Sequence, residues 1–116
     1  MQKVGITQVR NRLKEAGLNA KVIISRQICL DVLPPPAGKG TALSYLRRKF
    51  NWPPRLIVVC GDSGNDMDML TLGFPAVLVG NASAEIKNHP LPPSVYRARA
   101  AHAAGIWEGL KWWNLV

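Results

Sequence analysis

The sequence predicts an α/β fold with a parallel sheet flanked by helices, and three observations support this prediction. Residues 55–60 (RLIVVC) and 75–80 (PAVLVG) are continuous apolar runs, which are typical of strands covered on both faces of a parallel sheet. Helical patterns lie between and after these runs, and such alternation indicates α/β layers joined by right-handed crossovers. The chain has 116 residues, 47% of them hydrophobic, which suffices for one small domain with a modest core.

The first third of the chain predicts a helix followed by a hairpin. Residues 6–17 carry apolar side chains at helical spacing, and Gly17 is suited to end the helix. Residues 20–25 (AKVIIS) and 27–34 (QICLDVLP) are rich in β-branched side chains and predict two strands. Only a tight turn fits between them, which indicates a β-hairpin. The three prolines at 34–36 exclude helix or central strand and mark the one candidate boundary between modules.

The rest of the chain continues the alternation of helices and strands. An apolar stripe predicts a helix over residues 40–50, which the following NWPP ends. A short helix is predicted after each apolar run, and a longer one near the C-terminus. These later elements are helices at 66–72, 82–88 and 101–113 and a third strand at 95–98.

An acidic, glycine-bearing stretch, GDSGND at residues 61–66, directly follows the first apolar run. In a parallel α/β sheet, ligands bind beyond the carboxyl ends of the strands, which is where this stretch falls. Asp62 and Asp66 are hard oxygen donors, and such donors suit Mg²⁺, which keeps waters and phosphate oxygens as further ligands. Helix capping would explain one aspartate. Three aspartates and an asparagine around two glycines favour a metal site instead.

A lysine between two glycines, Lys39, stands at the start of the helix predicted over residues 40–50. There its ammonium could reach a phosphate or pair with a carboxylate. The surrounding residues do not form a nucleotide P-loop, because the first glycine of that motif is missing and Gly40 stands in place of the serine or threonine. Taken alone, this lysine would be expected in solvent.

Together and in this order, the segments LDVLPPPAGKGTALSYL, VVCGDSGNDMDML and AVLVGNASAEI resemble the C-terminal part of a haloacid dehalogenase-superfamily phosphatase. The resemblance is closest to the sucrose-6-phosphate phosphatase group, which includes the phosphatase-like domains attached to sucrose-phosphate synthases. HAAGIWEGLKWW resembles the last helix of that group. The resemblance implies that residues 1–36 are the end of an α+β cap domain and that residues 37–116 are the C-terminal half of a Rossmann-like core.

The resemblance also implies a chemistry, in which a Mg²⁺-bound aspartate attacks the phosphorus of a sugar phosphate, here sucrose 6-phosphate. A phospho-aspartate forms, and water then hydrolyses it. In this scheme Lys39 stabilises the phosphoryl oxygens and the nucleophile, Asp62 holds Mg²⁺ directly, and Asp66 acts at or just outside the metal shell. Asn65 and Ser63 would orient metal, water or phosphate.

The resemblance thus assigns three overlapping sets of residues. The catalytic set is Lys39, Asp62 and Asp66; the phosphate- and substrate-binding set is Lys39, Gly38, Ser63 and Asn65; the metal set is Asp62, Asp66 and Asn65. Asp68 lies two residues beyond the motif and is expected to be an acid on the helix surface.

The chain departs from the family pattern in its first half. The D-x-D segment that carries the nucleophile, and the serine or threonine that holds the phosphate, are not found, and the only acids before Asp62 are Glu15 and Asp31. Three hypotheses follow. The favoured one is that the sequence is a fragment of a larger enzyme. It could also be the second half of a split enzyme completed by another polypeptide. The third is a non-catalytic relic that binds a sugar phosphate or a sucrose-phosphate synthase partner.

The net charge, the apolar segments and the cysteines limit the partners and the compartment that can be expected. The net charge is +8, yet the basic residues are scattered and the longest basic run is residues 47–49, so a solvated helix face is expected rather than a nucleic-acid site. A basic surface would attract a phosphorylated substrate. No apolar segment reaches the ~18 residues of a membrane span, and no signal peptide is recognised, so a cytoplasmic protein is expected. Cys29 and Cys60 are expected to be buried thiols rather than a disulfide.

Overall fold

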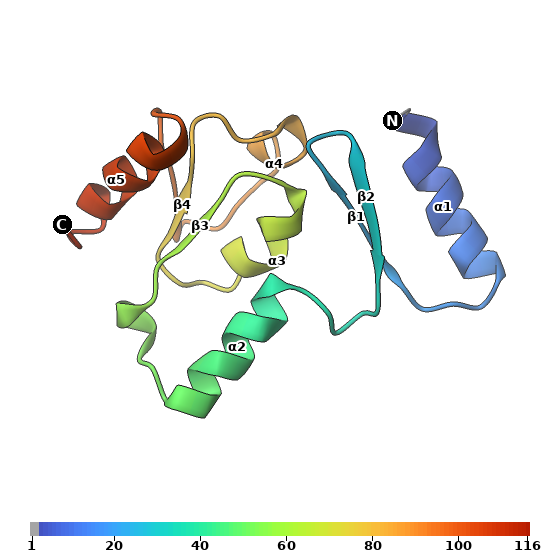
Figure 1. The fold of residues 1–116 in the computed structure, drawn as a ribbon, viewed down its shortest axis with the longest axis horizontal. Coiled ribbons are helices and arrows are strands. Elements are labelled where there is room, and N and C mark those ends of the chain that lie inside the picture. Colours follow the sequence, from blue (N-terminus) through green and yellow to red (C-terminus); the bar gives the residue numbers. More distant parts are fainter. Residues whose placement is uncertain (1–2) are drawn as a thin grey trace.

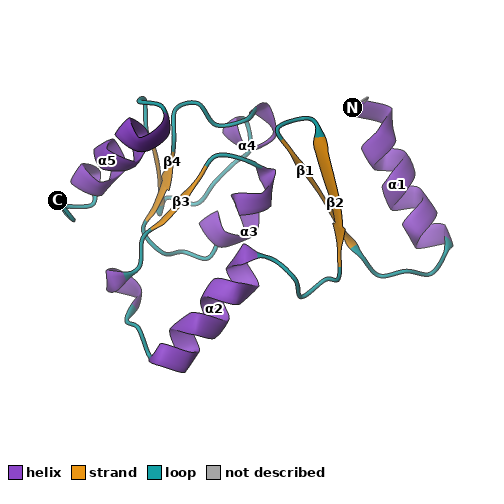
Figure 2. Ribbon diagram, in the orientation of Figure 1, coloured by secondary structure: helices purple, strands orange, loops and turns teal. Residues whose placement is uncertain are grey.

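The computed structural model describes residues 3–116 and contains two separate sheets (Figure 1). An antiparallel hairpin follows the first helix, and a three-stranded parallel sheet with flanking helices forms the remainder (Figure 2). The α/β fold class is therefore confirmed. No helix within the described residues is long and apolar enough to cross a membrane.

The bounds of the elements agree broadly with the prediction. The helices are α1 (Lys3–Glu15), α2 (Lys39–Phe50), α3 (Met67–Leu70), α4 (Ala84–Lys87) and α5 (His102–Trp112), with 3-10 turns η1 (Pro54–Leu56) and η2 (Gly64–Asp66). The strands are β1 (Lys21–Ser25), β2 (Cys29–Leu33), β3 (Val59–Gly61), β4 (Ala76–Leu78) and β5 (Val95–Arg97).

The predicted hairpin is confirmed. Strand β1 pairs antiparallel with β2, so that Ser25 lies opposite Cys29. Residues 26–28 connect the two strands, and Arg26 and Gln27, with φ of 56° and 62°, are the central residues of a β-turn closed by a hydrogen bond from the N–H of Ile28 to the carbonyl of Ser25 at 3.2 Å. Two central residues with positive φ define a type I′ turn, whose twist matches that of the paired strands. Gly17, with φ of 72°, ends α1 as expected.

Strand β4 is the centre of the parallel sheet, between β3 and β5. Its residues Ala76, Val77 and Leu78 are 0%, 0% and 2% exposed. Val77 packs against α5, where a side chain at Gly109 would collide with it. Ala76 and Leu78 point to the opposite face and share a core cluster with Leu70 of α3. Because helices cover both faces, this strand is apolar throughout.

Strand β3 is shorter than the predicted strand at 55–60. Its pairing with β4 begins at Val59, and the residues before it form the 3-10 turn η1, in which Leu56 is 71% exposed. The sheet order β3-β4-β5 places β3 at one edge, where no second strand of residues 3–116 pairs with it. The N–H of Ile57 bonds back to the carbonyl of Pro54 at the end of η1 rather than to a neighbouring strand, which accounts for the later start of β3.

The two cysteines are free, as expected, but one of them is not buried. Cys29 and Asp31 lie on the same face of β2, and both are exposed. The prediction of a buried Cys29 is therefore wrong, because its side of this two-stranded sheet faces solvent. Cys60 is half-buried, and this burial raises the pKa of its thiol.

The tip of the hairpin rests on the loop that follows β3. A side chain at Gly64 would collide with the carbonyl oxygen of Ile24 at the end of β1. Next to this contact, the backbone N–H of Asn65 donates to the hydroxyl of Ser25 at 3.2 Å, and Ser25 is only 6% exposed. The two sheets are thus joined by backbone-to-backbone packing that only glycine permits.

We expect Gly64→Ala to destabilise the chain by about 3 kcal/mol, because the added methyl group must push the hairpin away from the loop. Urea denaturation would measure the change in the free energy of unfolding. Gly17→Ala is the matched control: its new methyl group meets no atom within 4 Å, so only the positive φ should be penalised, at about 1 kcal/mol. Equal losses in the two variants would contradict the proposed contact.

Candidate functional site

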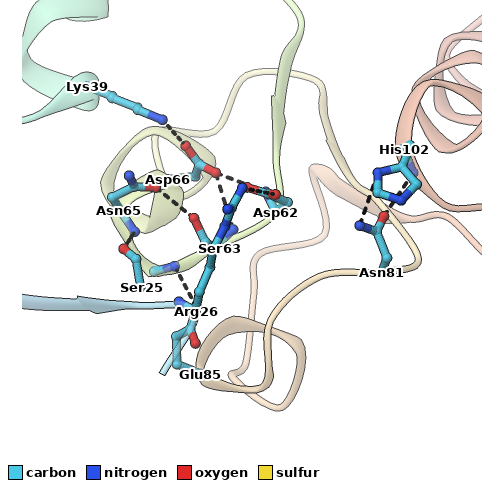
Figure 3. Close-up of polar contacts among 11 residues, drawn as sticks. Ser25, Arg26, Lys39, Asp62, Ser63, Asn65, Asp66, Asn81, Glu85 and His102 are labelled. Carbon is cyan, nitrogen blue, oxygen red and sulfur yellow. Dashed lines mark hydrogen bonds and ion pairs between the residues drawn. The ribbon is translucent and has the colours of Figure 1, made fainter. Parts of the chain in front are cut away.

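The acid loop, residues 61–66, leaves the carboxyl end of β3 and is shaped by one buried carboxylate. Asp66 is 3% exposed. Its Oδ2 accepts hydrogen bonds from the backbone N–H groups of Asp62 at 2.9 Å and Ser63 at 3.3 Å. Its Oδ1 accepts from Nζ of Lys39, which reaches in from the start of α2 at 2.5 Å (Figure 3). The structure therefore joins the two separately predicted motifs through this carboxylate.

Asp62 has the opposite environment, because its side chain is 43% exposed. It lines a pocket of about 360 Å³ together with Lys39 and Asp66. The far wall of this pocket is formed by residues that follow β4 and begin α5, among them Asn81 and His102. The predicted catalytic set thus meets at one pocket, and Asp62 presents its carboxylate to it.

The other predicted binding residues do not line this pocket. Ser63 is 4% exposed, and its hydroxyl donates to Oδ1 of Asn65 at 2.8 Å. Gly38 precedes α2, where a side chain would collide with the carboxylate of Asp68. In this structure these residues support the acid loop and the start of α2. Their contact with phosphate or metal stays a prediction.

The expectation that Asp68 is a surface acid is wrong. Its Oδ2 accepts a hydrogen bond from the backbone N–H of Gly40 at 2.8 Å, and its Oδ1 is buried. The first N–H groups of a helix have no partner within the helix, so this carboxylate satisfies one at the start of α2. Sequence spacing could not show this, because the contact joins α3 to a helix 28 residues away. Asp68 therefore fixes the turn that carries Lys39.

Glu85 of α4 was not anticipated, yet it ties the hairpin to the acid loop. Its carboxylate accepts from Nε2 of Gln27 at 3.0 Å and from the backbone N–H groups of Arg26 at 3.2 Å and Gly64 at 2.9 Å. Partial burial raises the pKa of this carboxyl, but the hydrogen bonds from Gln27, Arg26 and Gly64 lower it by more, so the pKa lies below its ordinary value of 4.5.

Asn81 and His102 form a polar pair on the far wall of the pocket (Figure 3). Oδ1 of Asn81 accepts from the backbone N–H of His102 at 2.8 Å, and its Nδ2 lies 3.4 Å from Nδ1 of the imidazole. His102 has φ of 53°, which Asn81 helps to hold. The sequence did contain a signal that Asn81 could belong to the site, because this residue also follows the carboxyl end of a strand.

The oxygen donors at the pocket fit Mg²⁺. The residues described here include no group of three or more His, Cys, Asp or Glu side chains placed to hold a metal ion. Mg²⁺ needs no such cage, because it takes one or two carboxylates and fills its other positions with water and phosphate oxygens. Asp62 has an exposed carboxylate for this purpose, whereas the oxygens of Asp66 are already engaged by Lys39 and the loop amides.

The fold and the site define the class of protein. A parallel sheet with an acid loop at the end of an edge strand, and a lysine brought to it by a neighbouring helix, is the fold of the haloacid dehalogenase superfamily. A haloacid dehalogenase-like hydrolase from B. subtilis shares the fold, with a TM-score of 0.68 and 24% identity over 96% of this chain and 37% of its own.

The chain belongs to the Sucrose-6F-phosphate phosphohydrolase family, whose model matches residues 1–114. Sucrose-phosphatase 1 of Nicotiana tabacum is 39% identical over 90% of this chain, and mannosylfructose-phosphate phosphatase of Agrobacterium fabrum is 34% identical over 93%. The sucrose-phosphatase of Synechocystis sp., solved with sucrose and phosphate, has a TM-score of 0.89 and 32% identity over 98% of this chain. The chain spans 27%, 44% and 48% of these relatives, respectively.

We expect Asp68→Ala to destabilise the chain by about 1–2 kcal/mol, because the buried N–H of Gly40 loses its acceptor. Thermal denaturation followed by circular dichroism would measure the loss. Asp31→Ala removes an exposed acid of β2 and should change stability by less than about 0.5 kcal/mol. A silent Asp68→Ala would show that the carboxylate does not support α2.

Glu85 should make stability depend on pH. Its pKa is lower in the folded chain than the ordinary 4.5, so its contribution is complete above that value and is lost as pH falls through the lower, folded pKa. Glu85→Gln should therefore cost about 0.5–1 kcal/mol at neutral pH, a value reduced for solvent screening. The difference from wild type should shrink as pH falls below 4.5 and through the lower, folded pKa. Urea titrations at each pH would measure this difference, and Glu15→Gln, which removes an exposed acid at the end of α1, is the control and should change stability at neutral pH by less than about 0.5 kcal/mol.

Proposed function

We propose that this chain provides the lysine and the metal-binding acid of a Mg²⁺-dependent phosphatase that hydrolyses a sugar phosphate, with sucrose 6-phosphate as the substrate. The observation that carries the proposal is the ion pair between Lys39 and the buried Asp66, 2.5 Å long, beside the exposed carboxylate of Asp62. Residues 1–36 would be the end of a cap domain and residues 37–116 the C-terminal half of the core.

The proposed reaction has two displacements. An aspartate of a D-x-D segment, which the family places ahead of the residues found here, attacks phosphorus with a carboxylate oxygen. The phosphorus–oxygen bond to the sugar breaks, and the departing oxygen takes a proton. Water then attacks the phospho-aspartate, so that the aspartyl–phosphate bond breaks and inorganic phosphate leaves.

Lys39, Asp66 and Asp62 have different roles in the proposed reaction. Lys39 places a positive charge where the transferring phosphoryl group gains negative charge. Asp66 keeps that ammonium aimed at the pocket, since it is buried and cannot move far. Asp62 would hold Mg²⁺, which when bound neutralises charge on the phosphoryl oxygens.

The substrate class follows from the relatives. The tobacco and Synechocystis proteins are sucrose-phosphatases, and the Agrobacterium protein is a mannosylfructose-phosphate phosphatase. All three names refer to the phosphate of a disaccharide, either sucrose or mannosylfructose, and the family model names a sucrose phosphate. We therefore propose a disaccharide monophosphate as the substrate. We also propose that the protein acts in the cytoplasm and has no nucleic-acid partner.

A non-catalytic role is the second candidate, and one observation favours it. Asp62 and Asp66 are the carboxylates that line the pocket, and neither Glu15 nor Asp31 does so. A phosphatase-like domain with this set would bind a sugar phosphate, or a sucrose-phosphate synthase partner, without turning it over. Both candidates predict the same pocket but differ in whether a nucleophile completes it.

A hybrid enzyme separates the two candidates. The N-terminal half of a sucrose-phosphatase relative, fused ahead of Met1, should restore Mg²⁺-dependent release of phosphate from sucrose 6-phosphate. Lys39→Ala and Asp62→Ala in that hybrid should each lower kcat at least about 100-fold, because charge stabilisation or a metal ligand is lost. Asp31→Ala, on the exposed face of β2, is the control and should stay active.

Two outcomes would contradict this proposal. A folded hybrid that binds Mg²⁺ but hydrolyses no sugar phosphate would favour the non-catalytic role. Rapid turnover by the 116-residue chain alone would show that its nucleophile lies among its own acids.

A further inference from the structure

Arg26 stands at the tip of the hairpin with a fixed backbone and a free side chain. Its backbone N–H donates to Glu85 at 3.2 Å, and the neighbouring Ser25 accepts from Asn65 of the acid loop. The side chain, by contrast, is 69% exposed. The position of the Cα atom relative to the acid loop is therefore set, while the long side chain can still move.

The turn itself does not favour arginine at this position. Arg26 has φ of 56°, in the left-handed region where a side chain costs energy and glycine does not. The chain thus keeps a long cationic side chain at a place where glycine would form the turn more easily. Backbone strain of this kind is concentrated at functional sites, where the side chain has a role that offsets it.

The guanidinium is directed toward the site. Nη2 of Arg26 lies 3.9 Å from Oδ2 of Asp62. Figure 3 shows Arg26 extending from the hairpin to the acid loop, and Lys39 approaching the same loop from α2. An exposed ion pair of this length contributes little to stability. Arg97 shows the contrast, because its guanidinium is already held by the carbonyls of Lys87 and His89 at 2.8 and 2.6 Å.

We propose that Arg26 is a second phosphate-binding cation, which the hairpin delivers beside Asp62, whose carboxylate lines the pocket together with Lys39. A guanidinium presents paired N–H donors that match two oxygens of a phosphate monoester, whereas the lysine ammonium acts as a point charge. Glu85 is its positioning residue, since it holds the turn against the acid loop. The inference rests on the proposed function, because it assigns the phosphate of that substrate to two cations, one from the hairpin and one from α2.

The test measures the affinity of the full chain for two ligands, phosphate and Mg²⁺, which the loss of Arg26 should affect differently. Inorganic phosphate, titrated in the presence of Mg²⁺ and followed by NMR, should bind about three- to ten-fold more weakly to Arg26→Gln. Mg²⁺ alone, measured by calorimetry, should bind Arg26→Gln as tightly as wild type or more tightly, because a positive charge beside Asp62 is gone. A merely structural role would weaken both ligands.

Three variants serve as controls. Arg55→Gln removes the same charge at an exposed position before β3, at the end of that strand away from the acid loop, and should change phosphate affinity by less than about two-fold. Arg26→Gly should raise the melting temperature, since it relieves the positive φ, and still weaken phosphate binding. Lys39→Met tests the phosphate site itself and should weaken binding at least as much.

The outcomes separate this inference from the proposed function. If Lys39→Met loses phosphate while Arg26→Gln matches Arg55→Gln, the inference fails and the proposed function stands. If the wild-type chain shows no phosphate-dependent shifts at Arg26 or Lys39, the inference also fails, and the hybrid enzyme tests the proposed function independently. Loss of both ligands in Arg26→Gln, with a lower melting temperature in Arg26→Gly, would reduce Arg26 to a structural residue.

Discussion

The buried carboxylate of Asp66 is the interaction on which the rest of the site depends. An ionised carboxylate with 3% exposure would be costly without donors around it. Two loop amides and the ammonium of Lys39 supply them. Because one set of donors comes from the acid loop and the other from α2, satisfying this charge both curves the loop and brings the lysine to it. Asp62 is left facing outward by the same curvature.

The acids near the pocket have different tasks because they have different neighbours. Asp62 is exposed and open to a metal ion, whereas Asp66 is buried and holds the lysine. Asp68 supports the first turn of α2, and Glu85 joins the hairpin to the loop. Four of the seven acids of the chain therefore surround one loop, in a protein with a net charge of +8. The acidic centre and the basic surroundings together suit a site for a metal ion and a phosphate.

Sequence patterns predicted the structure correctly where the pattern arises from the local environment of a single element. The apolar run of β4 reflects helices on both faces, and Gly17 ends α1 through its positive φ. Two motifs predicted Lys39, Asp62 and Asp66 as one set, and all three line the same pocket, while their catalytic part stays a prediction. These features depend on residues that are close in sequence or on the position of a strand end, and a sequence motif contains that information directly.

The sequence by itself determined the fold class, the hairpin, the acid loop and the family of this chain, because periodicity, turn chemistry and motif order are properties of short segments. Only the tertiary structure decided which carboxylates face the pocket. Asp68 and Glu85 act through contacts with Gly40 and Arg26, which are 28 and 59 residues away. Hydrogen bonds across such separations depend on how the helices and the hairpin pack, and no local pattern encodes that packing.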